Sequence, residues 1–219
     1  MHIDLVPALS RQELLTEEVV ERQTGLEKKF ESETIQRFLD YAHDWWNDFK
    51  AIRQAHKSRL VKIFAETDDR ESSVYKPVCS LIAPMMADRM LESPLHAARF
   101  VSLIPFHRME QPGAEKVEVW HSMQSFLSRG CGDSEDHAVL LCNLLLGFGL
   151  DAYVVVGTNS EGSHAWVMTR QPPNAQGKQH VDFWESLTGT KLANDDPRVH
   201  RFYRTVGCVF SNKSFFANI

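Results

Sequence analysis

The segment between residues 132 and 157 constrains the fold of this chain more than any other. It reads GDSEDHAVLLCNLLLGFGLDAYVVVG, so a polar and acidic start is followed by an apolar run that has no polar stripe. A helix that is apolar on every side is typical of a buried helix. Asp133 is placed to cap its N-terminus, and Gly147 and Gly149 are placed to end it before a strand from Ala152 to Val156. The sequence therefore predicts a buried helix followed directly by a strand.

Three later stretches also predict strands. They read AWVMT, VDFWE and RTVGCVF, and turn-forming residues separate the first strands from one another. Consecutive strands joined in this way usually pair antiparallel. We therefore expect an α+β fold in which the buried central helix packs on a small antiparallel sheet.

A long amphipathic helix is predicted to precede this core, from Thr16 onward. Apolar residues recur there at steps of three and four, which places them on one helix face that needs a core to cover it. We expect the opposite, charged face to be solvated. The apolar face consists of Ile35, Phe38, Leu39, Ala42, Trp45, Trp46, Phe49 and Ile52, and the charged face of Asp40, Asp44, Asp48, Lys50 and Arg53.

Two shorter helices are predicted between the long helix and the buried one. Ser93 and Pro94 form a typical N-cap and first helical position, for a helix that should end near Pro105. A second helix is expected over residues 117–127, with Gly130 closing it in the left-handed conformation.

Composition narrows the classes of partner. The 219 residues carry 24 Lys and Arg against 29 Asp and Glu, so the formal net charge of −5 makes nucleic acid an unlikely main partner. No window approaches the ~20 apolar residues of a membrane span, and the start lacks the parts of a signal peptide, so we expect a soluble, intracellular protein. The 4 cysteines form no CxxC motif, and we expect no metal site, no disulfide framework and no cofactor.

Three positions together suggest acyl-transfer chemistry. Ser134 lies at the predicted N-terminus of the buried helix, His164 opens the next strand but one, and Glu185 ends the strand after that. These residue types, at these positions in the predicted helix and strands, suit a nucleophile, a base and a residue that orients the base. The helix N-terminus would stabilise an anionic nucleophile, and its first backbone amides would donate to an oxyanion.

The motifs GDSEDHAVLLCNLLLGFGLDA, SHAWVMT and DFWESLTG, in this order, resemble the transglutaminase-like branch of the papain-type cysteine peptidases. Together with FLDYAHDWWNDF, HKSRLVKIF, PVCS and AARFVSLIPF, they resemble more closely a seventy-six-kilodalton family of centrosomal proteins. This resemblance implies C2-type regions before the transglutaminase-like domain. We therefore expect residues 1–15, which include the strand-like HIDLVPAL, to end a preceding C2-like region or linker. Residues 16–70 would form a helical N-terminal part of the domain, and residues 71–219 its core.

The nucleophile position departs from the family pattern. The resemblance puts the family's cysteine on Ser134, its histidine on His164 and its acid on Glu185. A thiol readily ionises to a thiolate beside an imidazolium and a helix N-terminus, whereas a hydroxyl stays protonated at the same place. We expect most thiol-peptidase chemistry to be lost, whether Ser134 is native or an engineered replacement.

The resemblance implies a location in the cytoplasm and cytoskeleton, at the centrosome and centriole or in a ciliary assembly. It also implies centriolar protein partners and a role in limiting centriole duplication. The favoured hypothesis is a pseudo-peptidase whose cleft binds a protein or peptide. A second hypothesis is an active papain-like peptidase or transglutaminase-type acyl transferase, and a third is a structural domain whose cleft is filled.

Several other residues are alternatives for the site or are expected to be structural. Cys131 is an alternative nucleophile that would lie outside the helix, and Asp182 is an alternative acid that would point to the other side of its strand because its spacing from Glu185 is odd. His137 is expected to form hydrogen bonds near the helix start. The residues favoured as core are Cys142, Cys208, Trp120, Trp166 and Trp184.

Overall fold

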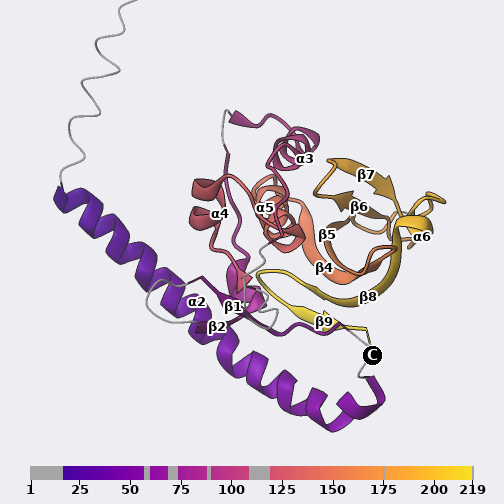
Figure 1. Ribbon diagram of the computed structural model, residues 1–219, viewed down its shortest axis with the longest axis horizontal. Helices are drawn as coiled ribbons and strands as arrows, with labels where there is room; N and C mark the ends of the chain where they lie inside the picture. The colour runs from indigo at the N-terminus through magenta and orange to yellow at the C-terminus, as the bar shows by residue number, and fades with distance from the viewer. Residues whose placement is uncertain are drawn as a thin grey trace, which may run out of the picture.

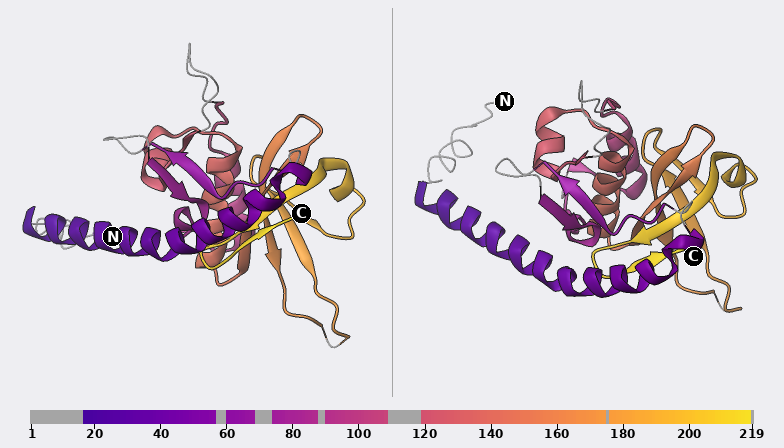
Figure 2. Two further views of the ribbon diagram at one scale, coloured as in Figure 1. Left: turned by 90° about the horizontal axis from the view of Figure 1, so that it is seen from below. Right: turned by 60° about the horizontal axis from the view of Figure 1, so that its bottom comes forward.

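The computed structural model of the chain describes residues 17–56, 60–68, 74–87, 90–108, 119–174 and 176–218. The predicted strand HIDLVPAL and the region 1–15 lie outside these residues. The first described element is the long helix α2 (Glu17–Ile52), which is followed by a short 3-10 helix, η2 (Arg53–His56). The N-terminal part of α2 projects beyond the rest of the molecule, and its C-terminal part runs along the body (Figures 1 and 2).

The predicted apolar face of α2 packs against the body except at its last residue, Ile52, which is exposed. Phe38, Ala42 and Phe49 are buried, and the charged face opposite is exposed, as expected. The Tyr41 hydroxyl donates to the carbonyl of Phe215 at 3.1 Å, which ties the helix to the last strand. A small cavity lies between α2 and the core, and it is lined by Phe38, Tyr41, Ala42, Trp45, Ile63, Pro77, Cys79 and Phe215. Among the described helices, none has the length and apolar character to cross a membrane.

Three helices surround the place where the site is expected. α3 (Pro94–Ser102) begins at an N-cap formed by Ser93, as predicted. The segment 117–127 was expected to be one helix, but the described part begins as a strand, β3 (Val119–Trp120), and α4 (Met123–Arg129) starts only after Ser122 caps it. Gly130 ends α4 with a φ of 65°. α5 (Ser134–Gly147) is the predicted buried helix.

α5 packs on a six-stranded antiparallel sheet, whose strand order is β7-β6-β5-β4-β8-β9. The α+β prediction is thereby confirmed, and the sheet exceeds the prediction by two edge strands, which the sequence pattern did not indicate because both are very short. The strands are β4 (Asp151–Asn159), β5 (Ser163–Arg170), β6 (Val181–Glu185), β7 (Thr190–Ala193), β8 (Tyr203–Phe210) and β9 (Phe215–Ala217), and the short helix α6 (Val199–Phe202) precedes β8.

A smaller sheet has the order β2-β1-β3 and was not expected. β1 (Phe64–Thr67) pairs antiparallel with β2 (Val74–Pro77) and parallel with β3, and the 3-10 helix η3 (Val78–Leu81) follows β2. β1 lies inside residues 16–70, so that region is not helical throughout. The parallel pairing of β1 with β3 joins segments far apart in sequence, and no local sequence pattern predicts such a contact.

The six-stranded sheet has an apolar cluster on each side. Alternate residues of a strand face opposite sides, so Ala165 and Val167 contact the α5 side while Trp166 faces the other. Trp120, Trp166 and Trp184 are all buried, which confirms them as core residues. The first residue of α5 and the ends of β5 and β6 hold the three predicted site positions.

Candidate active site

Ser134 is the first residue of α5, directly after its N-cap. Asp133 closes a capping box, in which its carboxylate accepts hydrogen bonds from the backbone amides of Glu135 and Asp136 while the carboxylate of Asp136 accepts from the amide of Asp133. This arrangement fixes the start of the helix at the expected residue. It therefore presents Ser134 at the positive end of the helix dipole.

His164 and Glu185 meet as a hydrogen-bonded pair. The Nε2 atom of His164 lies 2.9 Å from Oε2 of Glu185, which also accepts a hydrogen bond from the Tyr203 hydroxyl at 3.3 Å. The His164 ring stacks on Trp166, and Trp166 stacks in turn on Tyr203. The imidazole is thus held at one nitrogen and along one ring face, and its Nδ1 atom carries no hydrogen bond to a described residue.

The surroundings favour a protonated His164. Burial alone would lower the pKa of His164, but the hydrogen bond and negative charge of Glu185, assisted by the charges of Glu135 and Glu161, raise it above its ordinary value. Glu135 belongs to the first turn of α5, so the charge of that turn is part of the electrostatic surroundings of the imidazole. Burial, together with the charge of Glu185, raises the pKa of Tyr203, which keeps its hydroxyl a donor.

The hydroxyl of Ser134 turns toward its neighbour in sequence. It donates to Oε2 of Glu135 at 2.8 Å, and within the described residues it makes no hydrogen bond to His164. Ser134 is 8% exposed and His164 7%, so the surrounding side chains nearly close the site to solvent. The structure therefore joins two of the three predicted positions directly, and it directs the proton of the third to a carboxylate.

The capping box also limits what the helix end can offer to an oxyanion. The amides of Glu135 and Asp136, which the sequence suggested as donors, already bind the Asp133 carboxylate at 3.2 Å each. The backbone amide of Ser134 itself carries no hydrogen bond to a described residue. Burial, with the nearby charge of Asp136, raises the pKa of Asp133 to about 6.

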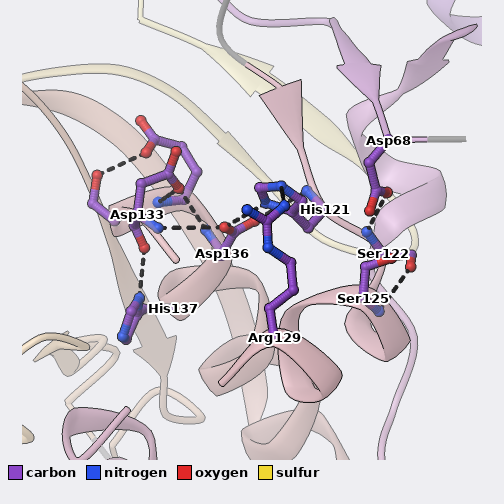
Figure 3. A network of polar contacts seen from close by, with 10 residues as sticks. Asp68, His121, Ser122, Ser125, Arg129, Asp133, Asp136 and His137 are labelled. Atoms are coloured by element: carbon purple, nitrogen blue, oxygen red, sulfur yellow. Dashed lines mark hydrogen bonds and ion pairs between the residues drawn. The ribbon is translucent and has the colours of Figure 1, made fainter. Parts of the chain in front are cut away.

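A second acid–imidazole pair includes Asp136, in the first turn of the same helix (Figure 3). Nδ1 of His121 lies 2.8 Å from Oδ2 of Asp136, and the guanidinium of Arg129 donates to Nε2 of His121, also at 2.8 Å. Because Nε2 accepts, the proton of the neutral ring is on Nδ1, where it is donated to Asp136. Its hydrogen bond to Asp136 raises the pKa of His121, against the effect of burial.

Sequence reasoning missed this second pair. His121 and Asp136 are fifteen residues apart and lie on different elements, and no local pattern relates them. The backbone amide of His121 also donates to Asp136, at 3.0 Å, so this carboxylate fastens the end of β3 to the start of α5. Figure 3 shows Asp136 between His121 and Asp133. The pair is buried, which suits a structural fastening of the helix that carries Ser134.

Within the described residues, none of the alternative site residues makes a hydrogen bond to His164 or Glu185. Asp182 is buried on the opposite side of β6, as its odd spacing predicts, where it binds Gln171 and Lys191. Cys131 is half-buried and precedes α5, as expected. Cys142 and Cys208 are fully buried in the core, and burial raises the pKa of Cys208 to about 12. His137 binds the carbonyl oxygens of Asp133 and Ile104 near the helix start.

In the part of the chain that the structure describes, no group of three or more His, Cys, Asp or Glu side chains is arranged to hold a metal ion.

Comparison with known proteins identifies the relatives of this chain. Residues 118–219 match a family model described as the CEP76 peptidase-like domain. The chain is 44% identical to Centrosomal protein of 76 kDa from Xenopus tropicalis and 42% identical to that from Homo sapiens, and in each case the match covers 99% of this chain and 33% of the relative. The chain thus spans about a third of the length of these relatives.

Among solved structures, Legionella pneumophila LapG is similar, with a TM-score of 0.46 and 16% sequence identity. That match covers 57% of this chain and 66% of LapG.

Proposed function

Because the chain belongs to the family of Centrosomal protein of 76 kDa, we propose that its peptidase-like domain binds a protein or peptide segment at the centrosome and does not cleave it. Its relatives are centrosomal proteins by name, and this chain shares their location. Centriolar proteins are the proposed partners, and restraint of centriole duplication is the proposed role of the whole protein.

The single observation that carries the non-cleaving function is the state of Ser134. A serine hydroxyl ionises far above neutral pH, so it needs a base to accept its proton before it attacks an amide. Here the hydroxyl donates to the carboxylate of Glu135, and that hydrogen bond directs its proton away from Nδ1 of His164. The site therefore holds a weak nucleophile whose proton is directed to a carboxylate and not to the imidazole.

The retained His164–Glu185 pair favours one alternative. An imidazole oriented through Nε2, whose Nδ1 makes no hydrogen bond to a described residue, is the kind of base that an active peptidase or acyl transferase needs, and a thiol at position 134 would lie at the N-terminus of α5. Under this alternative, Ser134 works as a serine nucleophile or stands in for cysteine. The burial of Ser134 and His164 favours the third function, a structural domain with a filled cleft.

The experiment compares Ser134→Ala and the unaltered sequence in the full-length protein, in cells depleted of the endogenous copy. A non-cleaving domain predicts that both versions restore centriole number equally. As a matched change in the same helix turn, Asp136→Ala removes the fastening of α5 and should lower the protein's abundance. Loss of rescue by Ser134→Ala at normal abundance would establish the enzymatic alternative.

A chemical test separates the same alternatives in the purified chain. An electrophilic peptide with a vinyl sulfone group should label the unaltered protein slowly at neutral pH, and intact-mass measurement counts the adducts. Rapid stoichiometric labelling at Cys131, or amide hydrolysis that disappears with Ser134→Ala, would overturn the non-cleaving function.

A further inference from the structure

The exposed side of α3 carries the large apolar side chains of this helix. Its buried positions are the small residues Ala97, Ala98 and Val101, whereas Leu95 and Phe100 point outward. Leu103 is 62% exposed directly after the helix, and Phe106 is 51% exposed three residues later. A helix with one face in solvent normally buries its large apolar side chains, whereas α3 exposes them. Neighbouring exposed apolar side chains mark an interaction site. We call Leu95, Phe100, Leu103 and Phe106, together with exposed Arg99 and Arg108, the α3 surface.

The charged residues of the segment 93–108 are all cationic. Exposed Arg99 and Arg108 accompany the apolar residues, and His96 and His107 are exposed beside them. The chain contains no Asp or Glu from Ser93 through Arg108, although its net charge is −5. A cationic, apolar surface on an otherwise acidic protein is complementary to a segment that is acidic and apolar.

The α3 surface adjoins the candidate site on two sides. Phe106 forms a parallel bridge with Gly132, and the amide of His107 donates to the carbonyl of Gly132 at 2.7 Å, two residues before Ser134. At the other side, Gly189 lies against the carbonyl of Ala98, and the amide of Gly189 donates to the carbonyl of Glu185. Figure 1 shows α3 next to α5 and β7. The surface is therefore fixed to the segment before α5 and to the turn after β6, and it is pre-formed for binding.

We propose that the α3 surface docks a peptide segment of a partner protein that combines Asp or Glu residues with large apolar side chains. Phe106 and Leu103 contact the apolar side chains, and Arg99 and Arg108 pair with the carboxylates. This inference goes beyond the proposed function, since it does not use Ser134, His164 or Glu185. An anionic membrane is a different partner of similar charge, but helices that lie in a membrane interface have a polar face rich in Lys and Arg, and α3 carries one such residue, Arg99.

The test is a selection of random peptides displayed on phage against the purified chain. The enriched peptides should carry a surplus of acidic residues together with Leu, Ile, Phe or Trp. In fluorescence anisotropy, Arg99→Glu and Phe106→Ser should each weaken binding of an enriched peptide by about tenfold or more. The matched controls on α2, Arg37→Glu and Phe30→Ser, make the same changes at exposed positions and should leave the affinity unchanged.

Each other outcome overturns the proposal. These outcomes are no enrichment, enrichment of basic or uncharged peptides, and equal loss of affinity in the α2 controls. A further arm uses phosphatidylcholine vesicles with and without phosphatidylserine. The partner would be a membrane and not a peptide if the chain bound no peptide, sedimented only with the anionic vesicles, and lost this sedimentation in Arg99→Glu. Because Ser134→Ala leaves the α3 surface intact, its peptide affinity should equal that of the unaltered chain, which keeps this test separate from that of the proposed function.

Discussion

The Nε2 atom of His164 is held 2.9 Å from Oε2 of Glu185, whereas the hydroxyl of Ser134 is hydrogen-bonded to Glu135. The proposed base and the residue proposed to orient it thus lie together as a pair, and the hydroxyl at the proposed nucleophile position binds a different carboxylate. This separation makes the site's residual chemistry testable by changing one member at a time.

Ser134→Cys should create a thiol that ionises below the ordinary cysteine pKa of about 8.5, because the helix N-terminus and a protonated His164 both favour the thiolate. The thiolate absorbance can be followed against pH in a Cys131→Ser background, with Ser134→Cys/His164→Ala as the matched control. The control should titrate nearer to the ordinary value. An ordinary titration in both proteins would show that the helix end and the imidazole do not act on position 134.

Glu185→Gln should lower the pKa of His164, because the hydrogen bond and charge of Glu185 outweigh the effect of burial. The ring proton resonances of His164 in NMR spectra report this titration directly. Tyr203→Phe is the matched control, since it removes a hydroxyl that binds the same carboxylate and leaves the charge in place. An unchanged His164 titration in Glu185→Gln would contradict the pairing.

The same pair predicts a pH dependence of stability. The folded-state pKa of His164 is raised, so its contribution to the free energy of unfolding is fully present below about pH 6.5, the unfolded value, and is lost as pH rises through the folded value. In urea unfolding, the decline over this range should be smaller in Glu185→Gln than in the unaltered chain. A decline of equal size in both proteins would assign it to other groups.

Asp133→Asn should change the pH dependence on the acid side. Burial raises the pKa of Asp133 to about 6 from an ordinary 3.8, so the folded state holds this proton more tightly and the unaltered chain loses stability as pH rises through that interval. Asn still caps a helix but does not ionise. The free energy of unfolding of the Asp133→Asn variant, measured by urea unfolding, should therefore vary less between pH 4 and 7 than that of the unaltered chain. Asp133→Ala also removes the cap, and it should cost about 1 kcal/mol in addition.

Gly132→Ala should destabilise the fold more than Gly130→Ala. A Cβ atom at Gly132 would lie 2.5 Å from Oδ2 of Asp136 and 2.6 Å from the Phe126 ring, whereas one at Gly130 would meet nothing within 4 Å. Overpacking of this kind costs about 1–3 kcal/mol, and the positive φ of Gly130 costs about 1 kcal/mol by itself. Urea unfolding measures both, and equal losses would mean that the Asp136 region yields to the added methyl group.

Local patterns predicted the elements that depend on neighbouring residues. The capping residue Asp133 and the uninterrupted apolar run specified α5, and the Ser93–Pro94 pair specified the start of α3. Alternation along β6 also predicted that Asp182 and Glu185 lie on opposite sides. These features follow from backbone hydrogen bonding and side-chain periodicity within a few residues, so the sequence contains them directly.

Only the tertiary structure decided the contacts that join distant segments. The parallel pairing of β1 with β3, the edge strands β7 and β9, and the His121–Asp136–Arg129 fastening each depend on register and packing set elsewhere in the fold. The direction of the Ser134 hydroxyl was also decided there, although its acceptor is the next residue in sequence, because a position at the start of a helix does not by itself select one acceptor. That direction depends on which acceptor lies within hydrogen-bond distance once α5 has packed against the sheet, and this acceptor is the carboxylate of Glu135.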